Sequence, residues 1–274
     1  MKDPGSILIT GASSGIGGAL ALAYAAPGVV LVLGGRNQSR LEAVATACRE
    51  RGATVETRQI DVTDADAMAA WIAKADAAAR LDLVIANAGI SGGSFSAHGG
   101  ADSGTDQTRQ IFAVNVDGVI NTVLPAIQVL RARAEAQPAT GAKRAIPKPT
   151  IQGQIAIMSS LAGYRGMPGA AAYSASKAAV KVLGEGLRGA LRHDGIEVSV
   201  ICPGFIKTPM TDANPFPMPF IIGPERAAAI IKRGLDKGKA RIAFPFPANF
   251  LTWLATALPP GLIDPMLRRL PDKH

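Results

Sequence analysis

The stretch Thr10-Gly11-Ala12-Ser13-Ser14-Gly15-Ile16-Gly17 joins a short apolar segment over 6–10 to a helical pattern over 13–26. Its three glycines allow a tight turn, a close approach of the backbone to a pyrophosphate, and close packing of a helix on a sheet. The helix start would offer N–H groups and positive potential to that anion. The spacing Gly-x-x-x-Gly-x-Gly differs from the commoner Gly-x-Gly-x-x-Gly, so a purely structural strand-to-helix corner is the alternative.

Short apolar runs and longer helical patterns alternate along the rest of the chain. Several runs are apolar on both faces, which is typical of parallel strands buried between helix layers. This alternation predicts right-handed crossovers and an α/β fold with one doubly wound parallel sheet. The predicted strands are 6–10, 29–33, 54–59, 81–86, 154–159, 197–201 and, more weakly, 241–244, and the predicted helices are 13–26, 38–51, 64–79, 105–133, 173–193 and 224–235.

Composition narrows the class of protein. With 274 residues, 48% of them hydrophobic, the chain can bury a large core and is not disordered. Two cysteines and three scattered histidines provide no disulfide framework and no metal site, which predicts a reducing, cytoplasmic location. No signal peptide is predicted, and the most apolar later segment, 248–258, is too short to span a bilayer.

The formal net charge of +8 raises the question of an anionic partner. Aromatic residues are only 5% of the chain, so the stacking platforms of single-strand nucleic-acid binders are scarce. The excess of basic residues lies in 131–150 and 225–274, away from the alternating strand and helix pattern. Nucleic acid is therefore not an expected partner.

The end of the second predicted strand reads Gly34-Gly35-Arg36, where an NAD-selecting carboxylate would otherwise hold the ribose 2′-hydroxyl. A guanidinium at this point can pair with a 2′-phosphate, and Arg40 could add charge, so NADP(H) is predicted in preference to NAD(H). The alternative for Arg36 is a solvated residue at a helix start. Asp61-Val62 would lie near the adenine, although Asp61 could simply cap a turn, and Asn87-Ala88-Gly89 would lie where the cofactor passes.

A second group of residues carries chemistry. Ser160 follows the fifth predicted strand, and Tyr173 and Lys177 share one helix face at i, i+4. A phenol with a reference pKa of about 10 needs a neighbouring cation to act as acid or base near neutral pH, and Lys177 supplies one. Ser160 can hold a substrate carbonyl oxygen against the phenol. Asn115 is a polar residue in an otherwise apolar helix, which suggests a role in the site. The alternative is that its side chain only bends the helix or binds a water molecule.

These residues occur in the order and spacing of the short-chain dehydrogenase/reductase (SDR) family, which the chain resembles over about residues 5–210. The resemblance implies a single Rossmann-type domain of three αβα layers with about seven strands, hydride transfer between NAD(P) and a carbonyl or alcohol, and a homodimer or homotetramer. It implies Tyr173 as acid/base, Lys177 as the group that lowers its pKa and binds the nicotinamide ribose, Ser160 as the substrate-orienting serine, and Asn115 as the holder of a proton-relay water. The implied cofactor-binding residues are Gly11, Ser13, Ser14, Gly15, Ile16, Gly17, Arg36, Asp61, Val62, Asn87, Ala88, Gly89, Tyr173, Lys177, Pro203, Gly204, Ile206 and Thr208.

Two departures from the family pattern stand out. Ala86 occupies a position where an Asn often precedes Asn-Ala-Gly, and Ser14 one where many NADP-dependent members have a basic residue. The NADP prediction therefore depends mainly on Arg36. A Gly- and Ser-rich loop over 91–104 and an insertion over 137–152 are further peculiarities of this chain, and neither includes a catalytic residue.

The last quarter of the chain predicts the substrate class. We expect residues 1–243 to form the NADP-binding and catalytic domain, with an apolar lid over 205–223, and 244–274 to form an apolar and basic tail packed on that domain or on a partner subunit. The pocket would be bounded by the loop after Gly89, by 164–169 and by the lid, which favours an apolar carbonyl or secondary alcohol substrate. A core or subunit-interface role for the lid's apolar residues is the alternative. The tail could also lie on a membrane surface, but a structural or interface role is favoured.

The expected activity is that of an NADP-dependent oxidoreductase acting on the CH–OH group, a carbonyl reductase in the reducing direction. One alternative is a nucleotide-sensing regulatory protein that kept the fold and lost the chemistry; the Ser and Tyr would then be without use. Another is an epimerase or dehydratase of the same family, whose members usually have a larger C-terminal substrate domain. The substrate itself and the physiological direction do not follow from the sequence.

Overall fold

The computed structural model describes residues 2–92, 101–135, 151–212, 214, 217–259 and 261–262, with side chains omitted at 101–104 and 134–135. The predicted loop over 91–104 and the insertion over 137–152 lie largely outside this range, as do 213, 215 and 216 of the predicted lid and the end of the tail from residue 263.

A seven-stranded, wholly parallel sheet forms the middle layer, in the order β3-β2-β1-β4-β5-β6-β7. The two sequential halves of the sheet diverge between β1 and β4, so the carboxyl ends of these two strands form the crevice where doubly wound sheets bind ligands. The strands are β1 Ser6–Thr10, β2 Val30–Gly35, β3 Thr54–Gln59, β4 Leu83–Ala86, β5 Gly153–Met158, β6 Ile196–Pro203 and β7 Arg241–Phe244. The predicted doubly wound α/β fold is confirmed.

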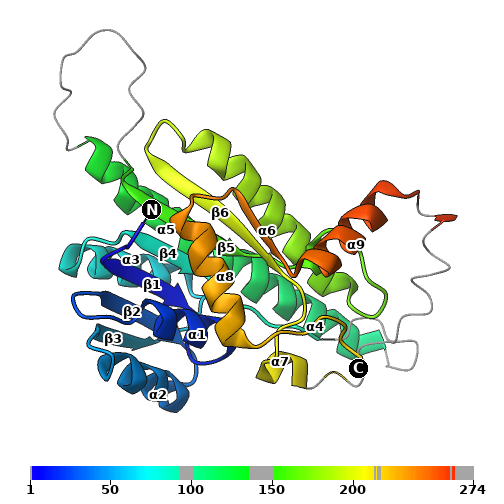
Figure 1. Cartoon of the computed structure of the whole chain (residues 1–274), viewed down its shortest axis with the longest axis horizontal. Coiled ribbons are helices and arrows are strands. Elements are labelled where there is room, and N and C mark those ends of the chain that lie inside the picture. The colour runs from blue at the N-terminus through cyan, green and yellow to red at the C-terminus, as the bar shows by residue number, and fades with distance from the viewer. Residues whose placement is uncertain are drawn as a thin grey trace, which may run out of the picture.

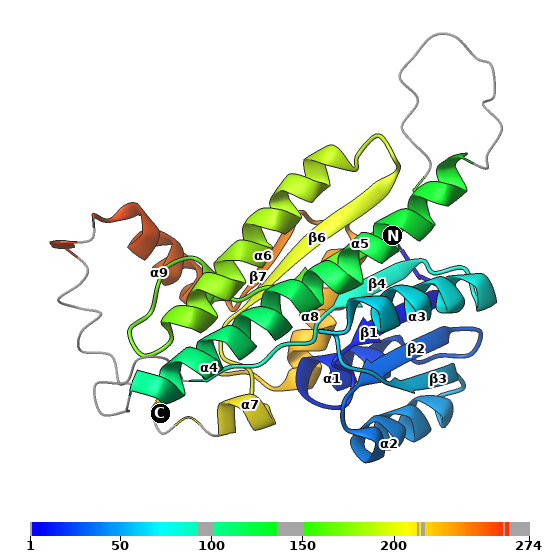
Figure 2. The same ribbon diagram turned by 180° about the vertical axis from the view of Figure 1, so that it is seen from behind.

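Helices cover both faces of the sheet (Figures 1 and 2). One face carries α1 Gly15–Tyr24, α2 Gln38–Arg49 and α8 Pro224–Asp236, with a core that includes Leu20, Leu41 and Ile231. The other carries α3 Ala65–Ala78, α4 Ala101–Phe112, α5 Gly118–Glu135 and α6 Ala171–Ala190, with a core that includes Ile72 and Val123. Each apolar strand is thus buried on both sides, which explains the continuous apolar runs in the sequence.

The long helix predicted over 105–133 is interrupted in the structure. α4 passes into a π-helical turn at Ala113–Asp117 before α5 begins. The sequence pattern is continuous here because a π turn inserts one residue without breaking the helical path. The interruption falls on the predicted site residue Asn115.

Within the part of the chain that the structure describes, one helical stretch, Thr105–Arg133, has the length and hydropathy of a membrane span. Half of it is buried in the fold, where α5 packs on α3, β4 and β5. It is therefore a core helix of the αβα layers.

The chain after β7 forms α9, Phe246–Ala257, which contacts β7 and the short 3-10 helix Leu161–Gly163. Arg165 fixes the end of α9, because its guanidinium donates to the carbonyl oxygens of Ala255 at 3.0 Å and Leu258 at 3.3 Å. A cation at the last helical carbonyls also suits the helix dipole. Both ribbon views show α9 standing out from the end of the layered body (Figures 1 and 2).

Candidate active site

A cavity of about 1010 Å³ opens at the carboxyl ends of the strands. Its wall includes the glycine turn after β1, the end of β2, the end of β4, the serines after β5 and the segment after β6. These segments lie far apart in the sequence, and the parallel sheet brings their ends to one edge. One continuous space thus joins most of the candidate nucleotide-binding residues to the candidate catalytic residues.

The glycine turn is shaped as the spacing predicts. Gly11 and Gly15 adopt φ angles of +66° and +56°, a conformation that favours glycine. The N-cap residue Ser14 makes no side-chain hydrogen bond to the first turn of α1, so the helix start is not capped internally. Ser13, Ser14 and Ile16 line the cavity with the two glycines.

Gly17 does not line the cavity and has a packing role instead. A Cβ at this position would lie 2.3 Å from the Gly11 carbonyl oxygen and 2.6 Å from Nδ2 of Asn87. Both contacts are far inside van der Waals distance. The third glycine therefore sets the distance between α1 and the turn, as the packing interpretation of the sequence predicts.

We expect Gly17→Ala to lower the free energy of unfolding by about 1–3 kcal/mol, because the turn must move to accept the methyl group. The affinity for NADPH should fall as well, since the displaced turn faces the cavity. Gly186→Ala is the matched control: this glycine lies inside α6, and a Cβ there meets nothing within 4 Å. Chemical denaturation and NADPH titration of both variants test this; equal stability of the two would contradict the packing role.

The end of β2 forms another part of the cavity wall. Gly34, Gly35 and Arg36 line it, together with Arg40 from α2. Gln59 Nε2 donates to the Arg36 carbonyl oxygen at 3.1 Å and so ties this backbone to β3. A Cβ at Gly34 would lie 2.4 Å from the ring of Trp71, a packing reason for glycine here that the sequence alone does not reveal.

Asp61 and Val62 also line the cavity. One Asp61 oxygen, Oδ1, accepts from the backbone N–H of Thr63 at 3.0 Å and from its hydroxyl at 2.9 Å. The turn-capping alternative is therefore present in the structure, alongside the position at the cavity wall.

The segment after β4 is tied to the glycine turn. Asn87 Nδ2 donates to the carbonyl oxygens of Thr10 at 3.0 Å and Gly11 at 3.2 Å, and the Thr10 hydroxyl oxygen accepts from the backbone N–H groups of Asn87 and Ala88. A Cβ at Gly89 would lie 3.1 Å from Asn115 Oδ1 and 3.2 Å from Lys177 Nζ. Asn87 and Ala88 thus tie the end of β4 to the end of β1 at the crevice, and Asn87, Ala88 and Gly89 all line the cavity.

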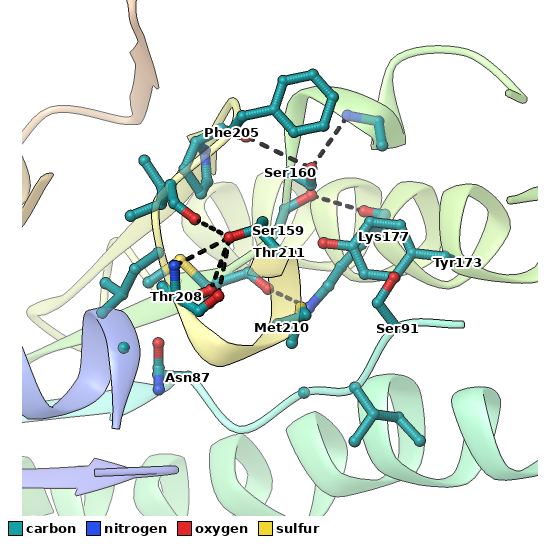
Figure 3. A pocket seen from close by; sticks show the side chains of 18 of the residues that line it. Asn87, Ser91, Ser159, Ser160, Tyr173, Lys177, Phe205, Thr208, Met210 and Thr211 are labelled. Carbon is teal, nitrogen blue, oxygen red and sulfur yellow. Dashed lines mark hydrogen bonds between the residues drawn. The ribbon is translucent and has the colours of Figure 1, made fainter. Parts of the chain in front are cut away.

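Ser160, Tyr173 and Lys177 converge at one part of the cavity (Figure 3). The Ser160 hydroxyl accepts from the Ala162 N–H at 3.1 Å and lies 3.4 Å from the Pro203 carbonyl oxygen, to which it donates. Lys177 Nζ lies 5.9 Å from the centre of the Tyr173 ring and donates to the Met158 carbonyl oxygen at 3.0 Å. The neighbouring Ser159 hydroxyl donates to the Lys177 carbonyl oxygen at 2.7 Å, joining β5 to α6.

Burial governs the protonation of these groups. It raises the pKa of Tyr173, and a side-chain hydrogen bond with Ser160 opposes that rise. Burial also lowers the pKa of Lys177 to about 8. That Lys177 lowers the pKa of Tyr173 stays a prediction; in the structure the ammonium donates to the Met158 carbonyl oxygen. Because burial raises the pKa of Tyr173, the phenol holds its proton at neutral pH.

Asn115 lies behind the cavity wall, at the centre of the π-helical turn, and is fully buried. Its Oδ1 accepts from the Ile90 N–H at 2.8 Å, while Nδ2 donates to the Ile90 carbonyl oxygen at 2.9 Å and to the Ser176 hydroxyl at 3.0 Å. The side chain thus joins the loop after β4 to α6, which carries Tyr173 and Lys177.

The segment after β6 forms another wall, with Pro203, Gly204, Ile206 and Thr208 at the cavity. The Thr211 hydroxyl organises it by donating to the Ile206 carbonyl oxygen at 2.7 Å and accepting from the Thr208 N–H at 2.9 Å. A bridge between Ile206 and Ile222 closes the base of the predicted lid.

Sequence reasoning missed one side of the cavity. Ala248, Leu251, Thr252 and Ala255 of α9 line it, whereas Arg165, which anchors α9, lines the cavity from within the predicted boundary 164–169. The only signal in the sequence was the helical spacing of small residues at 248, 252 and 255. Phe216 of the predicted lid lies outside the described residues.

Among the described residues, no group of three or more His, Cys, Asp or Glu side chains could hold a metal ion. Cys48 and Cys202 are both free and buried.

Comparison with known proteins agrees with this geometry. A family model for the short chain dehydrogenases matches residues 6–216. An uncharacterised oxidoreductase of Myxococcus xanthus is 38% identical over 96% of this chain and 96% of its own length. Two solved structures share the fold at 24% identity. The first is a short-chain dehydrogenase from Sphingobium yanoikuyae in complex with NADPH, with a TM-score of 0.74 over 97% of this chain and 96% of that chain. The second is an SDR from Burkholderia phymatum in complex with NAD, with a TM-score of 0.76 over 98% of this chain and 96% of that chain. The chain therefore belongs to the short-chain dehydrogenase/reductase family of oxidoreductases.

Proposed function

We propose that the protein is an NADP(H)-dependent oxidoreductase that reduces an apolar carbonyl compound, or oxidises the corresponding secondary alcohol, with Tyr173 as acid/base. The observation that carries the proposal is the single cavity that runs from the glycine turn past Arg36 to Ser160, Tyr173 and Lys177. A nucleotide sensor would need only the first part of that cavity.

The residues present fit a dinucleotide. The positive φ angles of Gly11 and Gly15 and the uncapped start of α1 suit a pyrophosphate against the backbone. Arg36 and Arg40 would bind the 2′-phosphate, with Asp61 and Val62 beside the adenine. The path toward the nicotinamide would be lined by Asn87, Ala88 and Gly89. The nicotinamide carboxamide would lie against Pro203, Gly204, Ile206 and Thr208. Lys177 would contact the nicotinamide ribose. When bound, the cofactor supplies or accepts the hydride.

The chain's own residues would then handle the proton and the substrate. The Ser160 hydroxyl would hold the carbonyl oxygen, and the protonated Tyr173 phenol would donate its proton to that oxygen as negative charge develops there. Lys177 would stabilise the phenolate left behind. Asn115 joins the loop after β4 to α6 and would thereby position the helix that carries Tyr173 and Lys177. It would also bind the proton-relay water that resupplies the proton to Tyr173.

The lining of the cavity supports an apolar substrate. Leu161, Met167, Phe205 and Met210 line the cavity, and Leu251 of α9 adds to its apolar lining. We propose a secondary alcohol or ketone with a sizeable apolar group. NADPH oxidation across steroids, quinones, aliphatic ketones and aldehydes, and acyl-thioester ketones tests the substrate class; activity confined to small polar carbonyl compounds would refute it.

The proposal extends to organisation and location. Residues 1–243 act as the NADP-binding and catalytic domain and 244–274 as its tail. We propose that the protein works in the cytoplasm as a homodimer or homotetramer, for which the exposed apolar side chains of Leu124 on α5 and Val182 on α6 offer contact surface. Light scattering of the purified protein checks the oligomeric state.

Cofactor selectivity should depend on Arg36. We expect Arg36→Ala to lower kcat/KM for NADPH about 10- to 100-fold, the value of a lost charge-assisted hydrogen bond, and to leave kcat/KM for NADH nearly unchanged. Arg49→Ala is the matched control, because Arg49 is exposed at the end of α2, the helix that follows Arg36, pairs with Glu42 and does not line the cavity. Unchanged selectivity in Arg36→Ala would show that Arg36 is a solvated surface residue.

A further inference from the structure

α9 has two different faces. Ala248, Leu251, Thr252 and Ala255 line the cavity, so this face belongs to the candidate active site. The opposite face, here called the outer face, consists of Phe246, Phe250, Trp253 and Leu254. At 100° per residue these four side chains fall within one sector of the helix, across from Ala248 and Ala255.

The outer face is apolar and exposed. Phe246 is 76% exposed and Trp253 53%. The aromatic rings contact one another, with ring centres 6.2 Å apart for Phe246 and Phe250 and again 6.2 Å apart for Phe250 and Trp253. A contiguous exposed apolar cluster of this kind marks an interaction surface rather than an ordinary solvated helix.

The charges around α9 favour a negatively charged partner. No charged residue occurs from Phe244 to Ile263 in the sequence. Arg241 lies at the border of the outer face, since it lines a small cavity together with Asn249 and Trp253, and it is ion-paired with Glu185. Arg165 lies at the other end of the helix, and the sequence beyond Ile263 has Arg268, Arg269 and Lys273 against Asp264 and Asp272, a net charge of +1. An apolar strip with a basic border is the pattern of helices that lie on anionic bilayers.

The size of the outer face argues against a second copy of the chain as its partner. A helix of 12 residues is about 18 Å long and about 10 Å wide. One such face is far smaller than the roughly 800 Å² per partner that stable protein interfaces bury. A lipid surface has no such requirement, because each inserted apolar side chain adds to binding on its own.

We propose that α9 is a membrane-docking helix, which inserts its outer face into the headgroup region of an anionic bilayer while its inner face stays on the cavity. Trp253 would then lie at the level of the headgroups, where tryptophan is favoured. The docking does not depend on the proposed hydride transfer, and its test needs neither substrate nor cofactor.

The two tryptophans of the chain give a direct probe. Trp253 is exposed on the outer face, whereas Trp71 is only 3% exposed. We expect vesicles of phosphatidylglycerol and bromine-labelled phosphatidylcholine to shift the emission of the whole protein to the blue and to quench about half or more of the Trp253 signal. Quenching should weaken several-fold with phosphatidylcholine alone and at high salt, because the basic border then loses its attraction.

Two variants control for adsorption by other surfaces. Trp253→Phe retains only the buried tryptophan and should show no quenching. Adding Thr46→Trp to that variant places a tryptophan at an exposed position of α2, away from the surface proposed for subunit contact, and should also show none. Absence of quenching in the wild type, or equal quenching of the tryptophan on α2, would overturn the proposal. A further contradicting result would be a change of oligomeric state in Phe250→Ser, measured by light scattering, together with no effect of lipid on the wild type. The outer face would then bind a second copy of the chain.

Discussion

Tyr173→Phe should lower kcat for carbonyl reduction by about 10³-fold or more while leaving the dissociation constant for NADPH within about twofold of the wild type. The substitution removes the phenolic oxygen and nothing else. Burial raises the pKa of Tyr173, so the wild-type phenol carries a proton at neutral pH and can donate it to the substrate oxygen. The phenyl ring would still fill the same space, so cofactor binding should survive. Steady-state kinetics and NADPH titration measure the two quantities separately.

Tyr164→Phe provides the matched control. Tyr164 lies nine residues earlier in the chain and lines a separate small cavity, with Lys181 Nζ and Arg241 Cζ each 5.6 Å from the centre of its ring. It does not line the large cavity, so its loss should leave kcat within about threefold of the wild type. Turnover that persists in Tyr173→Phe, or falls equally in both variants, would show that the phenol of Tyr173 is not the proton donor.

Lys177→Met should have the next largest effect, a loss of about 10²-fold or more in kcat together with weaker NADPH binding. Lys177 is almost fully buried and donates to the Met158 carbonyl oxygen beside the phenol. Methionine fills a similar volume but provides no charge to stabilise the phenolate that forms when Tyr173 gives up its proton. It also removes the donor proposed for the nicotinamide ribose, so both kcat and cofactor affinity should respond.

The pH profile distinguishes this role from simple packing. Burial lowers the pKa of Lys177 to about 8, so its ammonium is charged below that pH and neutral above it. The rate of carbonyl reduction should therefore be level below pH 8 and fall as the pH rises through it. Lys181→Met is the control, since Lys181 lies one turn further along α6, near Glu185, outside the large cavity. It should keep both the rate and the fall above pH 8; a wild-type rate that is flat across that range would contradict the role of Lys177.

Much of the fold could be predicted because the responsible signals are local. A strand, a glycine turn and a helix start are contiguous at 6–17, and the apolar runs of parallel strands follow from burial on both faces. Ser160, Tyr173 and Lys177 could be placed together because strand ends meet at one sheet edge and i, i+4 residues share a helix face.

The features that could not be predicted depend on contacts between distant segments. Gly34 needs to be small because Trp71 of α3 lies against it, and α9 becomes a cavity wall because it packs on β7 and is anchored by Arg165. The direction of the Tyr173 pKa shift also depends on tertiary structure, since burial raises this pKa and a side-chain hydrogen bond with Ser160 opposes the rise. The π-helical turn at Asn115 lies within a continuous run of helix-compatible residues, so the sequence predicts a single helix there.

The central claim is that this chain transfers a hydride between NADPH and a carbonyl carbon, with the proton supplied by Tyr173. Its most direct test is the reduction of a panel of apolar ketones with NADPH deuterated at C4 on each face in turn, followed by mass spectrometry of the alcohol. The account predicts an alcohol that carries one deuterium from one of the two labelled cofactors and none from the other, and no alcohol at all with Tyr173→Phe. Tight binding of NADPH without oxidation in the presence of any ketone of the panel, or an alcohol without deuterium from either cofactor, would contradict it.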